Sequence, residues 1–354
     1  MTGLPAVPPQ ETIQQVVSQL AARVPGRDLA RASAELSLAY RSAGAVGGAG
    51  GAGGAGGRGG GGSAEVPVGS DLAALAYLVT RFPATFAASR RALELSKESS
   101  AGWRPRSLVD VGAGPGTAAL AAASTWPDLE RALLLEPGRH MRSLGEELCA
   151  RLGLCGPSWR WGVAEPGEPG EPGELTGFDV VAMAYVLGEA GERADDLVAL
   201  WWERCSGLIV VVEPGTPAGF GVVRRVRSLL VSLGGTVVAP CPHEADCPMG
   251  EGDWCHFGVR LSRSSLHRRM KAGEVGWEDE KFSFAAVARP ALPGGRSAGR
   301  ILRRPGRQRR RVELSLCTEA GLERATIGRS SPLYRRAVKS AWGDAWPDAS
   351  ASRV

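Results

Sequence analysis

An alternation of short apolar runs and helical patterns between residues 105 and 238 most constrains the fold of this chain. It begins with the apolar run Ser107–Val111, which leads through a glycine-rich turn into the alanine-rich stretch Thr117–Ser124. Three further apolar runs each adjoin a segment with helical spacing; they are Arg131–Glu136, Phe178–Ala184 and Leu208–Glu213. Strands that alternate with helices form a parallel sheet with helices on both faces. We therefore predict a doubly wound α/β domain over 105–238.

The turn after the first predicted strand reads Asp110-Val-Gly-Ala-Gly-Pro-Gly-Thr117. Glycines at this place let the backbone approach a ligand, and the following helix presents free amide groups. A phosphate-binding P-loop would need Gly-Lys-Ser/Thr after a longer spacing, and a dinucleotide fingerprint would need glycine at position 117. The pattern instead resembles the first motif of class I S-adenosylmethionine-dependent methyltransferases. The remaining alternative is a glycine-rich turn that binds nothing.

The candidate cofactor site combines this turn with an acidic residue at the end of the second predicted strand. The predicted binding residues for S-adenosylmethionine are Asp110, Gly112, Gly114, Gly116 and Glu136. Glu136 is placed to bind ribose hydroxyl groups. Amino-directed methyltransferases usually carry Asn/Asp-Pro-Pro-Tyr/Phe after a later strand, whereas this chain has Ala182-Met-Ala-Tyr185. Likeness to a methyltransferase fold therefore does not establish methyl transfer.

Three cysteines lie in a turn-rich segment with the spacing Cys-x5-Cys-x7-Cys, and a fourth lies far downstream. They are Cys241, Cys247, Cys255 and Cys317. This spacing does not match the tight knuckles of a zinc ribbon, whereas wider spacing lets thiolates surround a cubane iron–sulfur cluster. We predict a cluster held by these four cysteines, with Zn²⁺ as the alternative. The neighbouring His243 and His256 are expected to hydrogen-bond to ligands instead of binding the metal.

Arginine is concentrated between Glu280 and Glu313, a stretch without any acidic residue. The arginines of this stretch are Arg289, Arg296, Arg300, Arg303, Arg304, Arg307, Arg309, Arg310 and Arg311. Such a stretch attracts phosphate through counterion release, and a solvated basic loop is the alternative. A predicted helix, Phe220–Leu233, adds three basic residues, which are Arg224, Arg225 and Arg227. We expect the arginine stretch to connect two late strands, Lys281–Ala288 and Arg311–Leu316.

The remaining segments complete the predicted domain order. It comprises N-terminal helices over 1–43, a Gly/Ala-rich linker over 44–70, a helical segment over 71–104, the methyltransferase-like domain over 105–238, and a metal-cluster subdomain with late strands and a basic C-terminal region over 239–354. Asp71 is expected to cap a helix and Pro83 to break it. The repeated Glu-Pro-Gly sequence within 165–174 predicts a surface loop.

The first ten residues lack a basic segment followed by an apolar one, as a secretory signal would have. No apolar run approaches the roughly 20 residues that span a bilayer. We therefore expect no membrane partner and a cytoplasmic location. In a reducing compartment, clustered cysteines bind metal more often than they form disulfides.

Several motifs together resemble one family. They are Tyr77–Phe86, Asp110–Thr117, Val211–Pro217, Pro240–His243, Trp254–Phe257 and Trp342–Asp344. The family comprises methyltransferase-like proteins associated with the mitochondrial ribosomal small subunit and their bacterial relatives, and the resemblance runs from Asp71 to Trp346. It implies a class I methyltransferase fold, a 4Fe–4S cluster on the four cysteines, and a role in small-subunit assembly or translation, with the small subunit and its rRNA as partners.

Two functions are compatible with these observations. The first is a ribosome-associated RNA-binding protein with a methyltransferase fold. The alternative is an active S-adenosylmethionine-dependent rRNA methyltransferase, so whether the chain is an enzyme is left open. The sequence contains a complete set of thiol ligands but no recognisable catalytic base, which favours the first function.

Overall fold

The computed structural model of this 354-residue chain describes residues 4–46, 68–156, 158–162, 176–271, 274–289, 292–295 and 297–347. Most of the predicted Gly/Ala-rich linker and the repeated Glu-Pro-Gly segment lie outside the described residues, and so does Arg296. The predicted domain boundaries stay predictions.

Helices and strands alternate through the central part of the chain, as the sequence predicts. The helices are α1 (Gln10–Ala21), α2 (Gly26–Val46), α3 (Asp71–Thr80), α4 (Phe82–Ser99), α5 (Thr117–Thr125), α6 (Arg139–Arg151), α7 (Leu187–Ala190), the 3-10 helix η1 (Gly191–Arg193), α8 (Ala194–Arg204), α9 (Pro217–Ser232), α10 (Ser265–Met270) and α11 (Tyr334–Lys339). The strands are β1 (Ser107–Val111), β2 (Arg131–Leu135), β3 (Trp159–Gly162), β4 (Phe178–Ala184), β5 (Cys205–Pro214), β6 (Thr236–Ala239), β7 (Phe257–Ser262), β8 (Trp277–Ala288), β9 (Gly299–Ile301), β10 (Gly306–Arg307), β11 (Arg311–Thr318), β12 (Gly321–Gly328) and β13 (Ala345–Trp346).

The main sheet has the strand order β3-β2-β1-β4-β5-β8-β6, with β7 paired to β8. The strands from β3 to β5 pair in parallel, so the predicted α/β sheet is confirmed there. The prediction of a wholly parallel sheet is wrong, because β8 runs antiparallel to β5, β6 and β7. This mixed sheet agrees with the methyltransferase-like fold that the resemblance implies.

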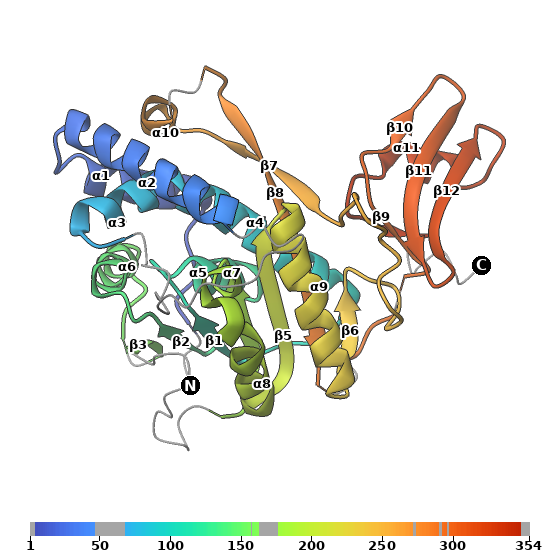
Figure 1. Cartoon of the computed structure of the whole chain (residues 1–354), viewed down its shortest axis with the longest axis horizontal. Coiled ribbons are helices and arrows are strands. Elements are labelled where there is room, and N and C mark those ends of the chain that lie inside the picture. Colours follow the sequence, from blue (N-terminus) through green and yellow to red (C-terminus); the bar gives the residue numbers. More distant parts are fainter. Residues whose placement is uncertain are drawn as a thin grey trace, which may run out of the picture.

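The position of β8 in the main sheet could not be read from its place in the chain. It follows residue 238, the predicted end of the α/β domain, but it pairs with β5 from Leu208 opposite Ala288 to Pro214 opposite Phe282. The chain reaches β8 from β7 through α10, and β7 and β8 form an antiparallel ribbon that extends beyond the sheet (Figure 1). One strand thus joins the sheet to the segments that follow the cysteine loop.

Helices cover both faces of the main sheet, because successive side chains of a buried strand point to opposite faces. Leu108 and Val180 pack toward the layer that contains α1 to α6, whereas Val109 and Val181 pack toward α8 and α9. Figure 1 shows α8 and α9 over the near face of the sheet and the N-terminal helices at the upper left.

The boundaries of α3 and α4 differ slightly from the expectation. Ser70 caps α3, because its side chain accepts a hydrogen bond from the Ala73 amide, and Asp71 is the first residue of the helix. The expected break falls at Arg81, and Pro83 lies in the first turn of α4, where a missing N–H costs no hydrogen bond.

A second, smaller sheet lies at the far end of the molecule, at the right of Figure 1. Its strand order is β10-β11-β9-β13, with β12 paired to β11. It has its own core of buried side chains, which are Ile301, Val312, Leu314, Leu316, Ala337 and Trp346. The arginine stretch therefore contains strands β9 and β10 and is not a simple connection.

Among the described residues, no single helix is long and apolar enough to cross a membrane; only α3 and α4, which are bent by 54°, reach that length and composition together.

The contact between the end of β5 and β8 gives a test of this fold. The Gly215 amide donates to the Lys281 carbonyl at 2.9 Å, and a Cβ atom on Gly215 would lie 2.6 Å from the Lys281 carbonyl carbon. Gly215→Ala should therefore lower the free energy of unfolding by about 1–3 kcal/mol, since backbone must move. Gly221→Ala on α9 meets nothing within 4 Å and should raise it by up to about 1 kcal/mol. Urea denaturation of both variants measures this, and a change of the same sign in both would contradict the packing.

Candidate functional site

The glycine-rich turn after β1 is held against the end of β2 by backbone hydrogen bonds. The amides of Gly112 and Ala113 both donate to the Leu135 carbonyl, at 2.9 and 3.0 Å. Gly112, Gly114 and Gly116 have φ angles of 71°, 54° and 87°. These angles are in the left-handed region, which glycine adopts without a steric penalty. The turn therefore requires glycine for its conformation as well as for access to a ligand.

Glu136 connects the turn to β2 through its side chain. The Gly114 amide donates to Glu136 Oε2 at 2.8 Å, and the Gly138 amide donates to Oε1 at 2.7 Å. Burial raises the pKa of Glu136 above its usual value, while these two amides act in the opposite direction. A carboxylate oxygen accepts more than one hydrogen bond, so Glu136 has acceptor capacity left for a ligand hydroxyl.

Asp110 lies inside β1 and is only 1% exposed. Its Oδ2 accepts a hydrogen bond from the Ala119 amide at 2.8 Å, which ties β1 to the first turn of α5. Burial raises the pKa of Asp110 to about 7, against the effect of the α5 amides. The side chain thus has a structural role at the base of the turn.

A cavity of about 130 Å³ opens beside this turn, and we call it the cofactor pocket. Of the predicted residues, Asp110, Gly112, Gly114 and Glu136 line it. Gly116 does not; a Cβ atom there would lie 3.2 Å from Leu134 Cδ2, so this glycine permits close packing inside the fold.

The cofactor pocket also contains residues that sequence reasoning missed. Tyr40 and Tyr77 enter it from the N-terminal helices, and Tyr185 and Glu189 enter it from the segment after β4. Tyr185 has a φ of 61°, a strained value for a residue with a side chain. Desolvation by the surrounding side chains raises the pKa of Glu189 to about 7, although the residue as a whole is exposed at the surface. A strained backbone after a central strand is typical of a functional residue, but the sequence does not reveal the φ angle of Tyr185.

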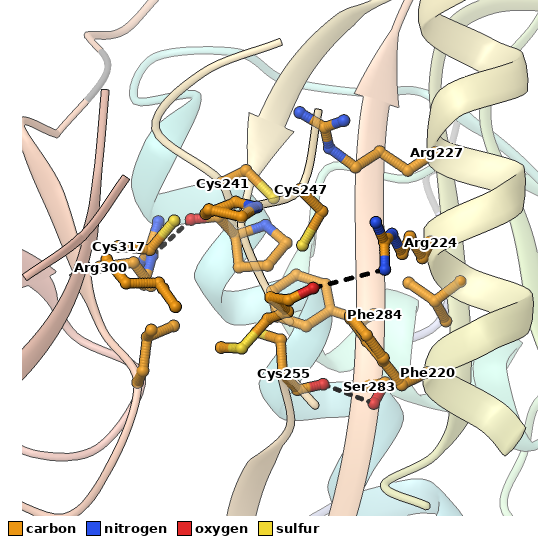
Figure 2. Close-up of a pocket in the computed structure, with 16 residues that line it drawn as sticks. Phe220, Arg224, Arg227, Cys241, Cys247, Cys255, Ser283, Phe284, Arg300 and Cys317 are labelled. Carbon is orange, nitrogen blue, oxygen red and sulfur yellow. Dashed lines mark hydrogen bonds between the residues drawn. The ribbon is translucent and has the colours of Figure 1, made fainter. Parts of the chain in front are cut away.

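The four predicted cysteines come together at a second pocket, between α9, β8 and the small sheet. Cys241, Cys247 and Cys255 belong to the loop 240–256 between β6 and β7, and Cys317 belongs to β11. All four line one cavity of about 40 Å³, which we call the cysteine pocket (Figure 2). Its other lining residues are Phe220, Val223, Arg224, Arg227, Pro240, Pro248, Met249, Ser283, Phe284, Arg300, Leu302 and Leu322.

Burial acts on three of the thiols in this pocket. It raises the pKa of Cys241 and Cys255, and it raises the pKa of Cys317 to about 12. His243 Nε2 lies 3.6 Å from Cys317 Sγ, the distance of a hydrogen bond to sulfur. His256 instead stacks on Trp254 and contacts the edge of Trp342. Within the described parts of the chain, no three His, Cys, Asp or Glu side chains converge on the position of a single ion.

Three arginines that were expected to contact phosphate line the cysteine pocket instead, and two of them are buried. Arg227 is 4% exposed and Arg300 is 2% exposed. Figure 2 shows Arg224 and Arg227 on the α9 side of the pocket and Arg300 on the opposite side, beside Cys317. The expectation of phosphate contact is therefore wrong for Arg227 and Arg300, because a residue-level charge pattern does not tell which side chains are buried.

Other arginines of the stretch are paired within the fold. Arg303 binds Asp253, Arg304 binds Asp279, and Arg289 donates to the Trp202 carbonyl. Four exposed arginines lie at neighbouring backbone positions of the small sheet, where the Arg329 amide donates to the Arg310 carbonyl at 2.9 Å. We call this surface the basic edge; it consists of Arg309, Arg310, Arg311 and Arg329.

The family model described as "Mitochondrial small ribosomal subunit Rsm22" matches residues 71–347. The human "Ribosome assembly protein METTL17, mitochondrial" is 30% identical over 291 residues, which cover 77% of this chain and 62% of that protein. The Schizosaccharomyces pombe "Rsm22-cox11 tandem protein 2, mitochondrial" is 24% identical over 331 residues, which cover 78% of this chain and 43% of that protein. The chain thus spans about half the length of these relatives. The resemblance indicated by the sequence motifs is confirmed.

Solved methyltransferase structures are also similar. A SAM-dependent methyltransferase from Aquifex aeolicus is 13% identical with a TM-score of 0.38, covering 60% of this chain and 95% of that chain. A precorrin-6Y C5,15-methyltransferase from Geobacter metallireducens is 15% identical with a TM-score of 0.38, covering 57% of this chain and 87% of that chain. At these scores the similarity carries no argument about function.

The predicted cytoplasmic location is wrong. The family and both curated relatives are described as mitochondrial, which points to the mitochondrion instead. The prediction rested on the lack of a secretory signal and of a membrane span. Neither criterion separates the cytosol from the mitochondrial matrix, because targeting to mitochondria uses a different kind of segment.

The buried Asp110 predicts a pH dependence of stability. Its pKa of about 7 in the folded chain lies above the ordinary value of 3.8, so folding favours the protonated form. The contribution to stability is complete below the unfolded pKa and is lost as the pH rises through about 7. Asp110→Asn cannot ionise and should flatten the decline in unfolding free energy between pH 4 and 7, whatever constant cost the amide adds.

Urea midpoints of wild type and Asp110→Asn at several pH values across this window measure the effect. The exposed Asp196→Asn on α8 is the control and should keep the wild-type decline. An equal decline in Asp110→Asn and wild type would show that folding does not raise the pKa of Asp110.

Proposed function

The chain belongs to the Rsm22 family of the mitochondrial small ribosomal subunit, and on this premise we propose that it binds the small subunit during assembly through contacts with rRNA. The basic edge is the observation that carries the proposal. Arg311 forms an ion pair with Glu313 on the same strand, whereas Arg309, Arg310 and Arg329 form no ion pair with any acidic side chain among the described residues. Clustered guanidinium groups bind phosphate and make the affinity dependent on salt.

Support also comes from the name of a relative. The human protein that is 30% identical is described as a ribosome assembly protein of mitochondria. The matched region of this chain, 71–347, contains the cysteine pocket, the basic edge and most of the cofactor pocket, to which Tyr40 and Val68 also contribute. The assembly role is therefore proposed for this matched region.

A second element of the proposal concerns the metal. We infer that Cys241, Cys247, Cys255 and Cys317 hold a 4Fe–4S cluster. Support comes from the lining of one pocket by all four thiols, and from the chemistry of thiolates, which suit iron–sulfur clusters. Each thiolate of such a cluster binds a different iron, so the ligands surround a volume. The cluster would tie the loop 240–256 to β11 and so join the main sheet to the small sheet.

The cofactor pocket supports binding of S-adenosylmethionine. The Glu136 carboxylate and the buried Asp110 at this pocket suit a ligand that has a ribose and positively charged groups. Thr117 Oγ1 is buried at this pocket without a hydrogen-bond partner in the described residues. A bound ligand would satisfy this hydroxyl group.

An active rRNA methyltransferase is the second candidate function, and Glu189 favours it. A carboxyl group with a pKa of about 7 at the edge of the cofactor pocket has the protonation behaviour of a general base. Loss of a methyl mark from rRNA in cells that lack the protein, restored by the wild type and not by Glu189→Gln, would establish this function. No lost mark would leave a binding protein.

Sedimentation of the protein with small-subunit particles tests the ribosomal proposal. Association should fall steeply with salt, and the triple variant Arg309→Ala, Arg310→Ala, Arg329→Ala should reduce the slope of log affinity against log salt by roughly 2–3. Arg225→Ala is the matched control, because that exposed arginine on α9 is already paired with Asp195 at 2.8 Å. Absence of the wild type from small-subunit and precursor fractions would contradict the proposal.

Metal analysis tests the cluster. Protein purified without oxygen should be brown, with absorbance near ~400 nm from thiolate–iron charge transfer, and Cys255→Ser should lose most of the iron. Cys155→Ser is the control, because Cys155 is exposed and lies outside the pocket. A colourless protein with one zinc per chain would show that the alternative is right.

Cys255→Ser, together with a variant of the cofactor turn, separates a role in assembly from a role in catalysis. Gly114→Val forces a side chain into a backbone with φ 54° and should abolish binding of S-adenosylmethionine without touching the cysteine pocket. We expect Cys255→Ser to impair small-subunit maturation and Gly114→Val to be tolerated. Equal loss of ribosome association in both, with both folded, would contradict this division.

A further inference from the structure

Two buried arginines face the cysteine pocket from opposite sides. Arg227 reaches it from α9 and Arg300 from β9, and both are more than nine-tenths buried (Figure 2). Arginine stays protonated in proteins, so the walls of this cavity carry two buried positive charges in addition to the exposed Arg224. A buried charge without a counter-charge is destabilising by several kcal/mol in order of magnitude.

The hydrogen bonds of these arginines do not supply the counter-charge. Arg227 Nη2 donates to the carbonyls of His243 and Ala245, at 2.6 and 3.0 Å. Arg300 donates from Nε to the Pro240 carbonyl and from Nη1 to the Gly343 carbonyl, at 2.8 and 2.9 Å. Among the described residues neither guanidinium forms an ion pair with a carboxylate.

Arg227 also has an unused donor. Its Nε is buried and has no hydrogen-bond partner in the described residues. Arg227 and Arg300 line the same cavity as the four thiols. The charged side chains that line this cavity are cations, namely Arg224, Arg227 and Arg300.

A thiolate-ligated metal centre has the charge that this pocket lacks. Four thiolates carry four negative charges, and the oxidised core of a four-iron cluster cancels two of them. The net charge of the centre is then opposite and equal to that of the two buried guanidinium groups, whereas Arg224 is exposed to solvent. Zinc with four thiolates has the same net charge, so the shared chemistry is a doubly negative tetrathiolate metal centre.

We propose that Arg227 and Arg300 are positioning residues that supply the counter-charge of the metal centre in the cysteine pocket. They hold the backbone of the ligand-bearing loop at Pro240, His243 and Ala245, and they neutralise the thiolates once metal is bound. This inference rests on the proposed metal site. It adds that the affinity for metal and the reduction potential of a cluster depend on these two side chains.

The experiment uses the full chain purified without oxygen, as wild type, Arg227→Gln, Arg227→Lys and Arg225→Gln. Iron retained against a chelator and the reduction potential of the cluster are measured for each. Arg227→Gln should bind metal about 10–100-fold more weakly, as expected when a group that supports the ligands is lost. Its potential should be more negative, because an added electron is less stable when a nearby positive charge is gone.

Arg227→Lys separates charge from hydrogen bonding, since it keeps the charge and loses the forked donor geometry. It should keep the wild-type potential, and the exposed Arg225→Gln should match the wild type in both measurements. If Arg227→Gln does not fold, Arg300→Gln replaces it and should shift the potential in the same direction. A brown Arg227→Gln with wild-type potential and iron retention would overturn the inference while leaving the cluster proposal intact.

Other outcomes decide the matter as well. An Arg227→Lys potential shifted as far as that of Arg227→Gln would show that hydrogen bonding, and not charge, is what matters, which overturns the inference. If the wild type holds zinc and no iron, the cluster proposal fails. In that case, the inference about the counter-charge is supported if Arg227→Gln weakens zinc binding about 10–100-fold, and it is overturned if zinc binding is unchanged. A wild type that holds no metal overturns both.

Discussion

The antiparallel pairing of β8 with β5 is the interaction on which both candidate sites depend. β8 lies between β5 and β6 and also pairs with β7, so it is the strand that joins β6 and β7 to the rest of the sheet. Its Ser283 and Phe284 line the cysteine pocket, and Glu280, nearer its start, lies 3.4 Å from the Tyr185 hydroxyl at the cofactor pocket. A single strand therefore sets the position of one site relative to the other. Movement of β8 along β5 would disturb both.

The two pockets have buried charges of opposite sign. Acids line the cofactor pocket, and burial raises the pKa of Asp110 and Glu136 there. Arginines line the cysteine pocket, where burial raises the pKa of Cys241 and Cys317. Burial of a charge is costly unless an opposite charge comes close. A ligand with positive groups in the first pocket and an anionic metal centre in the second would each relieve such a cost.

Strands with strong local signals could be predicted well from the sequence. Ser107–Val111 and Phe178–Ala184 are continuous apolar runs in the middle of the sheet, and the structure gives them the same bounds. β3 and β6 escaped notice because they are only four residues long. The cofactor turn could be predicted because its left-handed φ angles favour glycine, so the conformation is visible as a cluster of glycines in the sequence. Tyr185 has such an angle without being glycine, and nothing in its neighbours indicates it.

The sequence by itself determined the alternation of strands and helices, the glycine-rich turn and the set of four thiols, because each depends on residue type and local spacing. Only the tertiary structure decided that β8 enters the main sheet and that Cys317 reaches the loop 240–256, since both depend on contacts between distant segments. The arginines show the difference most clearly. Arg300 and Arg310 belong to one basic stretch, yet one is buried beside the thiols and the other is exposed at the basic edge. Charge is a property of the residue, whereas burial is a property of the fold around it.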